Sequence, residues 1–145
     1  MTEQPTPALE LDLKWDGDLR FVGTSDGVRV SLDAATQAGP TPVQALAFGL
    51  AGCMAIDLVS ILQRGRQPLR GLEARLSAER ANQSPKRFTA IELHFIIEGD
   101  IPPDRVERAI RLSRETYCSV WHSLRQDLGF ETSFEVRSAS GPSAK

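Results

Sequence analysis

Hydrophobic and polar residues alternate one by one in several short stretches of the chain, which is the pattern of strands with one face in the core. The alternating stretches are residues 9–15, 19–23, 28–32, 72–78, 91–97 and 130–136. Turn sequences rich in Asp and Gly separate the first three of them. These three therefore predict an antiparallel meander.

Two longer stretches have helical spacing. The first begins at residues 40–42 (Pro-Thr-Pro) and ends near Gly65, which is placed to adopt the left-handed conformation that closes a helix. It is apolar nearly all round, which predicts a central buried helix. Gln44 and Asp57 interrupt its apolar run, so we interpret it as a core helix and not as a membrane span.

The second helical stretch follows residues 102–104 (Pro-Pro-Asp) and ends at Gly129. Its apolar stripe comprises Val106, Ile110, Ser113, Tyr117, Trp121, Leu124 and Leu128. A break in this helix near Tyr117 and Cys118 would fit the pattern. The resulting order, βββ-α-ββ-α-β, predicts an α+β fold with a mainly antiparallel sheet of about six strands packed on two central helices.

The composition is that of an ordinary globular domain, with 145 residues, 41% hydrophobic and 25% charged. We expect a single domain over residues 1–145, with flexible tails at residues 1–7 and 138–145. The net charge of −2 argues against nucleic acid or an anionic membrane as a partner. The polar start of the chain has no apolar segment of the kind that directs secretion, so we expect a cytoplasmic protein.

In the cytosol, two cysteines are more often free thiols or a transient redox pair than a structural disulfide. Cys53 lies mid-way along the first helical stretch and Cys118 on or beside the stripe of the second. Because both helices should face one core, the two thiols could meet. The alternative is that each is a small buried hydrophobic residue without chemistry.

Other side chains offer less. Two cysteines without close spacing, together with His94 and His122, do not make a zinc constellation, so no metal is expected. Asp57 follows Cys53 by one helical turn, but a solvated or dimer-facing carboxylate is the more common case. An activated thiol needs a cation nearby, and Arg20 is the arginine we would choose.

Three segments carry a resemblance to a known family. They are residues 39–57, which contain Cys53, residues 87–95, and residues 106–120, which contain Cys118 within a Tyr-Cys-Ser-Val sequence. In this order they resemble the OsmC/Ohr family, in particular the branch with the same second-cysteine motif. The similarity extends over residues 11–136.

The resemblance implies an intertwined homodimer and thiol-dependent reduction of organic hydroperoxides. Cys53 would match the peroxidatic cysteine and Cys118 the resolving one, with Arg20 near the family's N-terminal arginine. No cofactor is implied beyond an external dithiol reductant. The substrate would be a small hydroperoxide.

One position departs from the family. A glutamate usually follows the proline that opens the helix, and here Gln44 is the nearest equivalent. A neutral amide can hydrogen-bond an arginine but cannot form the ion pair. On a regular helix Gln44 would also lie nearly opposite Cys53, so it approaches the thiol only if the helix starts late or bends.

Two further functions therefore stay open. The same fold could bind a small ligand without catalysis, the cysteines being incidental. Thiol-acyl chemistry at Cys53 is a third possibility. The sequence does not identify the substrate or the physiological reductant, nor whether the cysteines form a disulfide in the cell.

Overall fold

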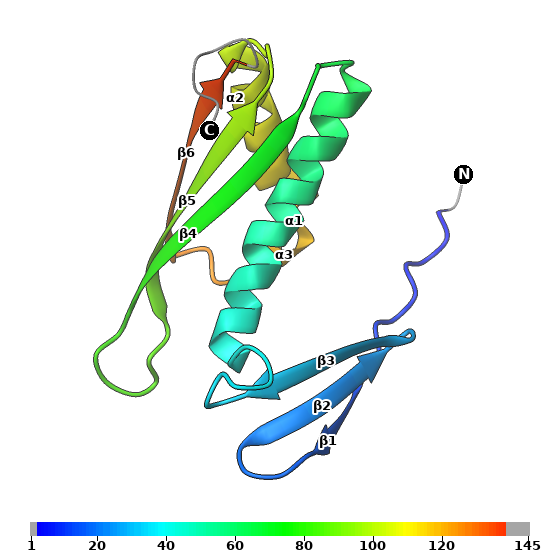
Figure 1. Cartoon of the computed structure of the whole chain (residues 1–145), viewed down its shortest axis with the longest axis vertical. Helices are drawn as coiled ribbons and strands as arrows, with labels where there is room; N and C mark the ends of the chain where they lie inside the picture. The colour runs from blue at the N-terminus through cyan, green and yellow to red at the C-terminus, as the bar shows by residue number, and fades with distance from the viewer. Residues whose placement is uncertain (1–2, 139–145) are drawn as a thin grey trace. The chain divides into compact units, whose positions relative to one another are not determined.

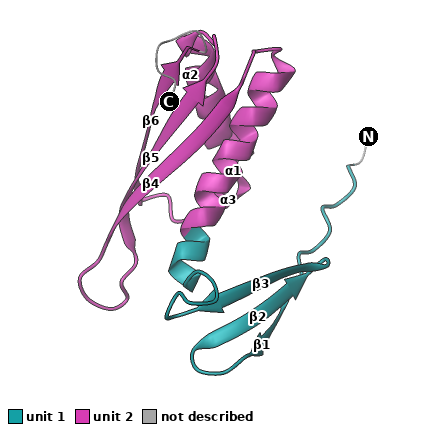
Figure 2. Ribbon diagram, viewed as in Figure 1, with its two compact units in different colours: residues 1–46 teal, residues 47–145 magenta. Residues whose placement is uncertain are grey.

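The computed structural model describes residues 3–138. By its internal contacts the chain divides into two compact units, residues 1–46 and 47–145 (Figure 2). Residues 1–2 and 139–145 of the expected tails lie outside the described residues, whereas Ser138 donates a hydrogen bond to Asp100 (2.6 Å). That the whole chain is one domain stays a prediction.

The first unit contains the expected meander of β1 (Asp12–Trp15), β2 (Arg20–Ser25) and β3 (Val28–Asp33) (Figure 1). All its pairings are antiparallel. Asp26 and Gly27 both have positive φ, at 48° and 79°. Such a pair forms the tight turn whose twist suits a two-residue hairpin.

The second unit combines a sheet with the helical elements. They are β4 (Gly71–Arg80), β5 (Phe88–Glu98), α2 (Pro103–Leu112), the π-helical turn η1 (Ser113–Tyr117), α3 (Ser119–His122) and β6 (Gly129–Arg137). Strand β5 is central, antiparallel to β4 and parallel to β6. The parallel pairing requires a crossover connection, which α2, η1 and α3 provide (Figure 1).

The α+β class and the order of the elements are confirmed. The six strands, however, form two sheets of three strands instead of one sheet of about six. Alternation identifies a strand and its buried face, but it carries no information about which strands share hydrogen bonds.

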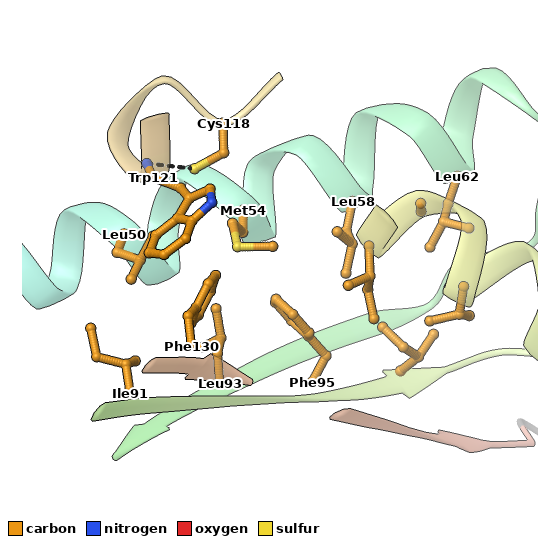
Figure 3. Packing of buried hydrophobic residues seen from close by; sticks show 14 of the residues in the cluster. Leu50, Met54, Leu58, Leu62, Ile91, Leu93, Phe95, Cys118, Trp121 and Phe130 are labelled. Atoms are coloured by element: carbon orange, nitrogen blue, oxygen red, sulfur yellow. Dashed lines mark hydrogen bonds between the residues drawn. The ribbon is translucent and has the colours of Figure 1, made fainter. Parts of the chain in front are cut away.

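The long helix α1 (Pro42–Arg64) begins in the first unit and continues through the second. Its buried residues recur every fourth position, at Leu50, Met54, Leu58 and Leu62. Figure 3 shows these side chains facing Ile91, Leu93 and Phe95 of β5. This contact is the core of the second unit.

The expectation that α1 is buried all round is wrong for the single chain. Phe48 and Ile56 are 69% and 70% exposed, because the sheet of the second unit covers only one stripe of the helix. By length and composition α1 would also suffice to cross a membrane. That is weak evidence, since the core helix of a soluble protein meets the same criterion.

The end of α1 differs from the sequence expectation by one residue. Arg66, and not Gly65, has the left-handed conformation, with φ 61°. The amide of Arg66 donates to the carbonyl of Gln63 (2.9 Å) and that of Gln67 to the carbonyl of Leu62 (2.9 Å). This pair of bonds is the Schellman motif, in which glycine is the favoured left-handed residue.

We therefore expect Arg66→Gly to stabilise the protein by about 0.5–1 kcal/mol, since it removes the steric cost of a side chain at positive φ. Urea unfolding measures the change. The matched control Arg64→Gly lies at the last residue of α1, where φ is not positive, and should destabilise by up to about 1 kcal/mol. Equal effects of the two substitutions would contradict the assignment of Arg66 as the closing residue.

Candidate functional site

Cys53 lies mid-way along α1 and is partly exposed. Asp57 follows it by four residues, so the thiol and the carboxylate occupy the same face of the helix. Asp57 is also partly exposed. The helix therefore presents a sulfur and a carboxylate side by side.

Cys118 is positioned by the π-helical turn η1. Its amide donates to the carbonyl of Ser113 (2.8 Å), a bond that spans five residues instead of four. In a continuous α-helix Tyr117 would follow Ser113 on the inner face, but the wider turn places Cys118 there. Cys118 is fully buried, and Tyr117 is 57% exposed.

The sequence analysis placed Tyr117 on the apolar stripe, which is wrong, and allowed for a break at this point, which is confirmed. After the break, the backbone of Cys118 is extended and its sulfur accepts a hydrogen bond from the amide of Trp121 (3.3 Å; Figure 3). This bond holds the sulfur at the start of α3.

The structure brings these elements together in one cluster. The sulfurs of Cys53 and Cys118 and a carboxylate oxygen of Asp57 all lie within 4.8 Å of one another. Ser113 donates from its hydroxyl to Oδ2 of Asp57 (2.7 Å), which ties η1 to α1. Both cysteines are free thiols. The expectation that the two thiols meet is confirmed.

Burial raises the pKa of the Cys118 thiol to about 11. Cys53 and the carboxylate of Asp57 add to the shift, while the amide of Trp121 acts in the opposite direction. At neutral pH Cys118 is therefore a protonated thiol that can donate a proton to its neighbours. A thiol of this kind is a poor nucleophile until a base removes the proton.

Native Cys118 is therefore expected to react slowly with iodoacetamide. At pH 8 a pKa of about 11, compared with the ordinary 9.0, leaves about 100-fold less thiolate. Timed labelling of the reduced protein in the presence of a chelator, followed by peptide mass spectrometry, measures the rate. Labelling in urea is the control, where Cys118 should react at the ordinary rate.

The pH dependence has a definite sign. The folded state holds the Cys118 proton more tightly than the unfolded state, so this thiol contributes stability below about pH 9 that is lost as the pH rises through 11. If iodoacetamide labels Cys118 equally fast in the native protein and in urea, the raised pKa of Cys118 is contradicted.

Arg20, the other charged residue that the sequence analysis selected, begins β2 in the first unit. Its guanidinium lies 3.5 Å from Oδ2 of Asp16 and 3.6 Å from Oδ2 of Asp33. Asp33 is buried, and the amides of Ala35 and Ala38 together with Arg20 hold the pKa of its carboxyl below the usual range. Arg20 thus has a structural role in its own unit, and its role in chemistry stays a prediction.

Gln44 lies in the first turn of α1, which begins at Pro42. The backbone N–H of Gln44 donates to the hydroxyl of Thr41 (3.1 Å), and the side-chain Oε1 of Gln44 accepts from the backbone N–H of Thr41 (3.0 Å). These reciprocal bonds form a capping box, which satisfies backbone groups at the start of the helix. The cap accounts for a glutamine at this position, and its part in chemistry stays a prediction.

Sequence reasoning underrated two residues of the cluster. It favoured a solvated or dimer-facing role for Asp57, and it treated Ser113 as one position of an apolar stripe. A signal was present in each case: Asp57 has one-turn spacing from Cys53, and Ser113 is a polar residue on an otherwise apolar face. Ser113 is fully buried, and a buried hydroxyl needs a partner.

Comparisons with known proteins agree with this fold. A family model described as OsmC-like protein matches residues 35–133, which is more than half of the chain. The Escherichia coli protein YhfA is 39% identical over 134 residues, which cover 90% of this chain and 100% of YhfA.

Two solved structures show the same fold at lower identity. An OsmC-like protein from Mycoplasma pneumoniae has a TM-score of 0.78 at 18% identity, covering 90% of this chain and 98% of its own. An organic hydroperoxide resistance protein OsmC from Legionella pneumophila has a TM-score of 0.68 at 16% identity, covering 92% and 100%. With the family match and the identity to YhfA, these likenesses establish that this chain belongs to the OsmC-like protein family.

Proposed function

We propose that this protein reduces organic hydroperoxides with Cys53 as the oxidised thiol and Cys118 as its resolving partner. The observation that carries the proposal is the approach of the two sulfurs to within 4.8 Å, from helical elements far apart in the sequence. The Legionella pneumophila protein with the same fold is named an organic hydroperoxide resistance protein, and this name supports the same chemistry.

The first step transfers one oxygen atom. The Cys53 thiolate attacks an oxygen of the O–O bond, that bond breaks, and the alkoxide leaves and takes a proton to become an alcohol. Cys53 becomes a sulfenic acid. Cys53 suits this step because it is partly exposed, so a small hydroperoxide can reach it.

The second step forms a disulfide. The Cys118 sulfur attacks the sulfenic sulfur, and water leaves with the Cys118 proton. The protonated state of Cys118 keeps it from competing for peroxide, and Asp57 is near enough to relay the proton from Cys118 to the leaving hydroxide. An external dithiol then reduces the disulfide by exchange.

Arg20 and Gln44 are the supporting residues of this proposal. We propose that Arg20 favours the thiolate of Cys53. We also propose that Gln44 takes the place of the family's glutamate and forms a hydrogen bond with Arg20. We also place the protein in the cytosol, where dithiol reductants keep such a pair cycling.

The wild-type protein provides the direct test. Reduced protein is mixed with one equivalent of cumene hydroperoxide, and intact-mass spectrometry follows the loss of two hydrogen atoms that marks a disulfide. Catalytic consumption of the peroxide with excess dithiothreitol should accompany it. No disulfide and no turnover with cumene hydroperoxide, tert-butyl hydroperoxide or other alkyl hydroperoxides would refute the proposal.

A ligand-binding function is the alternative. A groove of about 590 Å³ lies beside α1. It is lined by Leu72 of β4 and by residues of the helix, namely Ala55, Ile56, Val59, Ser60, Gln63 and Arg64. If the groove is the functional site, a variant with serine at both cysteines keeps its ligand binding. Mild peroxide should then produce no intramolecular disulfide in the wild-type protein. The wild-type test therefore separates the two functions.

We also propose that the protein is a homodimer. Each unit leaves large apolar side chains exposed, including Trp15 (70%) on β1 and Phe48 and Ile56 on α1. Apolar exposure of this extent on helix and sheet is typical of a surface that a partner covers. A second copy of the chain is the partner that the family resemblance implies.

Light scattering coupled to size-exclusion chromatography should therefore give twice the mass of 15.9 kDa. Ile56→Arg places a charge in the apolar surface and is expected to weaken dimerisation at least about 100-fold, because an unpaired charge is costly to bury. Glu92→Arg, on an exposed position of β5, is the control and should leave the mass unchanged. A monomeric wild-type protein at micromolar concentration would contradict the proposal.

A further inference from the structure

We propose that the reduced cluster of Cys53, Asp57 and Cys118 binds a thiophilic divalent cation, of which zinc is the representative. The site rests on three donor atoms that lie within 4.8 Å of one another inside the second unit. The inference does not depend on peroxide reduction, because it concerns the resting thiols.

The distances suit a tetrahedral ion after a small adjustment. With bonds of about 2.3 Å to sulfur and 2.0 Å to oxygen, two sulfurs on one zinc lie about 3.8 Å apart, and a sulfur and an oxygen about 3.5 Å. Atoms now within 4.8 Å would have to approach by only about 1 Å. Rotation of the partly exposed side chains of Cys53 and Asp57 can supply such a movement.

The kind of donor selects the kind of cation. Two thiolates and one carboxylate match zinc and cadmium, whereas magnesium and calcium prefer shells of oxygen. Three protein ligands also leave the fourth position of the ion for water or a small anion. The site would therefore be an open one.

The surroundings orient the donors. Ser113 donates a hydrogen bond to Oδ2 of Asp57 (2.7 Å), which orients the carboxylate and leaves it lone pairs for coordination. The amide of Trp121 already donates to the sulfur of Cys118 (3.3 Å), a bond that also stabilises a metal-bound thiolate. Among residues 47–138, no lysine or arginine forms an ion pair with Asp57. The cation itself would therefore offset most of the negative charge of two thiolates and one carboxylate.

The sequence analysis expected no metal because it considered only the cysteines and histidines. Neither histidine contributes here, since His94 bonds to Ser133 and Glu135, and His122 bonds to the carbonyl of Arg114. The third ligand is instead Asp57.

Metal binding and disulfide formation exclude each other at this site. A zinc ion needs both sulfurs as thiolates, while the disulfide uses the same sulfurs in a covalent bond. Oxidation of the pair, by hydroperoxide or another two-electron oxidant, therefore releases the ion. Bound zinc would conversely slow the oxidation of the two thiols, because it occupies the sulfur lone pairs that react with an oxidant.

Cobalt(II) provides the spectroscopic test. The full-length protein, reduced with a phosphine and freed of metal, is titrated with Co²⁺ and then with Zn²⁺ in competition. We expect one ion per chain, a thiolate-to-cobalt charge-transfer band, and the visible bands of a tetrahedral ion. The disulfide form, and the variants Cys53→Ser and Cys118→Ser, should lack the charge-transfer band of the two-thiolate site.

The carboxylate distinguishes this site from a simple dithiol. Asp57→Asn is expected to weaken zinc binding at least 10-fold, and Asp104→Asn, an exposed aspartate of α2, should have no effect. Should Asp57→Asn fail to fold by circular dichroism, Ser113→Ala tests the same carboxylate and should weaken binding about 10-fold.

Three results would overturn the inference. They are an absence of tetrahedral cobalt bands in the reduced wild-type protein, equal zinc affinity of the disulfide form, and unchanged affinity in folded Asp57→Asn or Ser113→Ala. Peroxide turnover measured with a chelator reports on the proposed function separately, so failure of one test does not imply failure of the other.

Discussion

Cys53→Ser is expected to lower hydroperoxide turnover at least about 1,000-fold, because a serine hydroxyl cannot be oxidised to the sulfenic acid on which both later steps depend. Consumption of cumene hydroperoxide with excess dithiothreitol measures the rate. The substitution replaces a partly exposed sulfur by oxygen, so folding should be preserved, as circular dichroism can verify.

Cys118→Ser is expected to behave differently. Cys53 still reacts with the first equivalent of peroxide, and intact mass should increase by one oxygen atom. Without the resolving thiol the sulfenic acid persists or is oxidised further, and turnover then depends on direct reduction by dithiothreitol.

The double variant provides the control for this assignment. Because the two thiols act in sequence on one oxidising equivalent, Cys53→Ser with Cys118→Ser should be no slower than Cys53→Ser alone. Turnover that survives in Cys53→Ser, or a sulfenic acid that forms on Cys118 first, would contradict the proposed order.

Phe95→Ala is expected to destabilise the protein by about 3–5 kcal/mol, because it leaves a cavity in the contact between α1 and β5. Phe95 is fully buried and lies opposite the inner stripe of α1 (Figure 3). Urea unfolding followed by circular dichroism measures the loss, with Phe95→Leu as a conservative variant that should cost about 1–1.5 kcal/mol.

Tyr117→Ala is the informative comparison. The hydrophobic pattern places Tyr117 on the buried stripe, but η1 leaves it 57% exposed. We therefore expect a loss below about 1 kcal/mol. A loss as large as that of Phe95→Ala would mean that Tyr117, and not Cys118, faces the core.

Much of the fold was predictable from local patterns. The meander of β1–β3 follows from alternation and from turns with Gly at positive φ. The start of α1 follows from Thr41 and Pro42, whose preferences act on the nearest turn only. At the end of α1 the left-handed residue is Arg66 instead of the expected Gly65, so the local rules located the end of the helix to within one residue.

The chemistry was less predictable because it depends on a long-range contact. Cys53 and Asp57 are a local pair, visible as one-turn spacing. Their approach to Cys118 and Ser113 requires that η1 packs against α1, and the π-turn decides which of two neighbouring residues points inward. A period of 3.6 residues selects Tyr117, so the pattern gave the wrong inner residue where the turn widens.

The amino-acid sequence by itself determined the strands, the helices, the two cysteines and their resemblance to a peroxide-reducing family. Each of these depends on neighbours in the chain or on motifs that can be read in order. Only the tertiary structure decided the division into two sheets, the exposure of Phe48 and Ile56 on α1, and the cluster of two thiols with one carboxylate. Those features depend on which surfaces meet, and burial and proximity between distant segments are set by packing that no local pattern encodes.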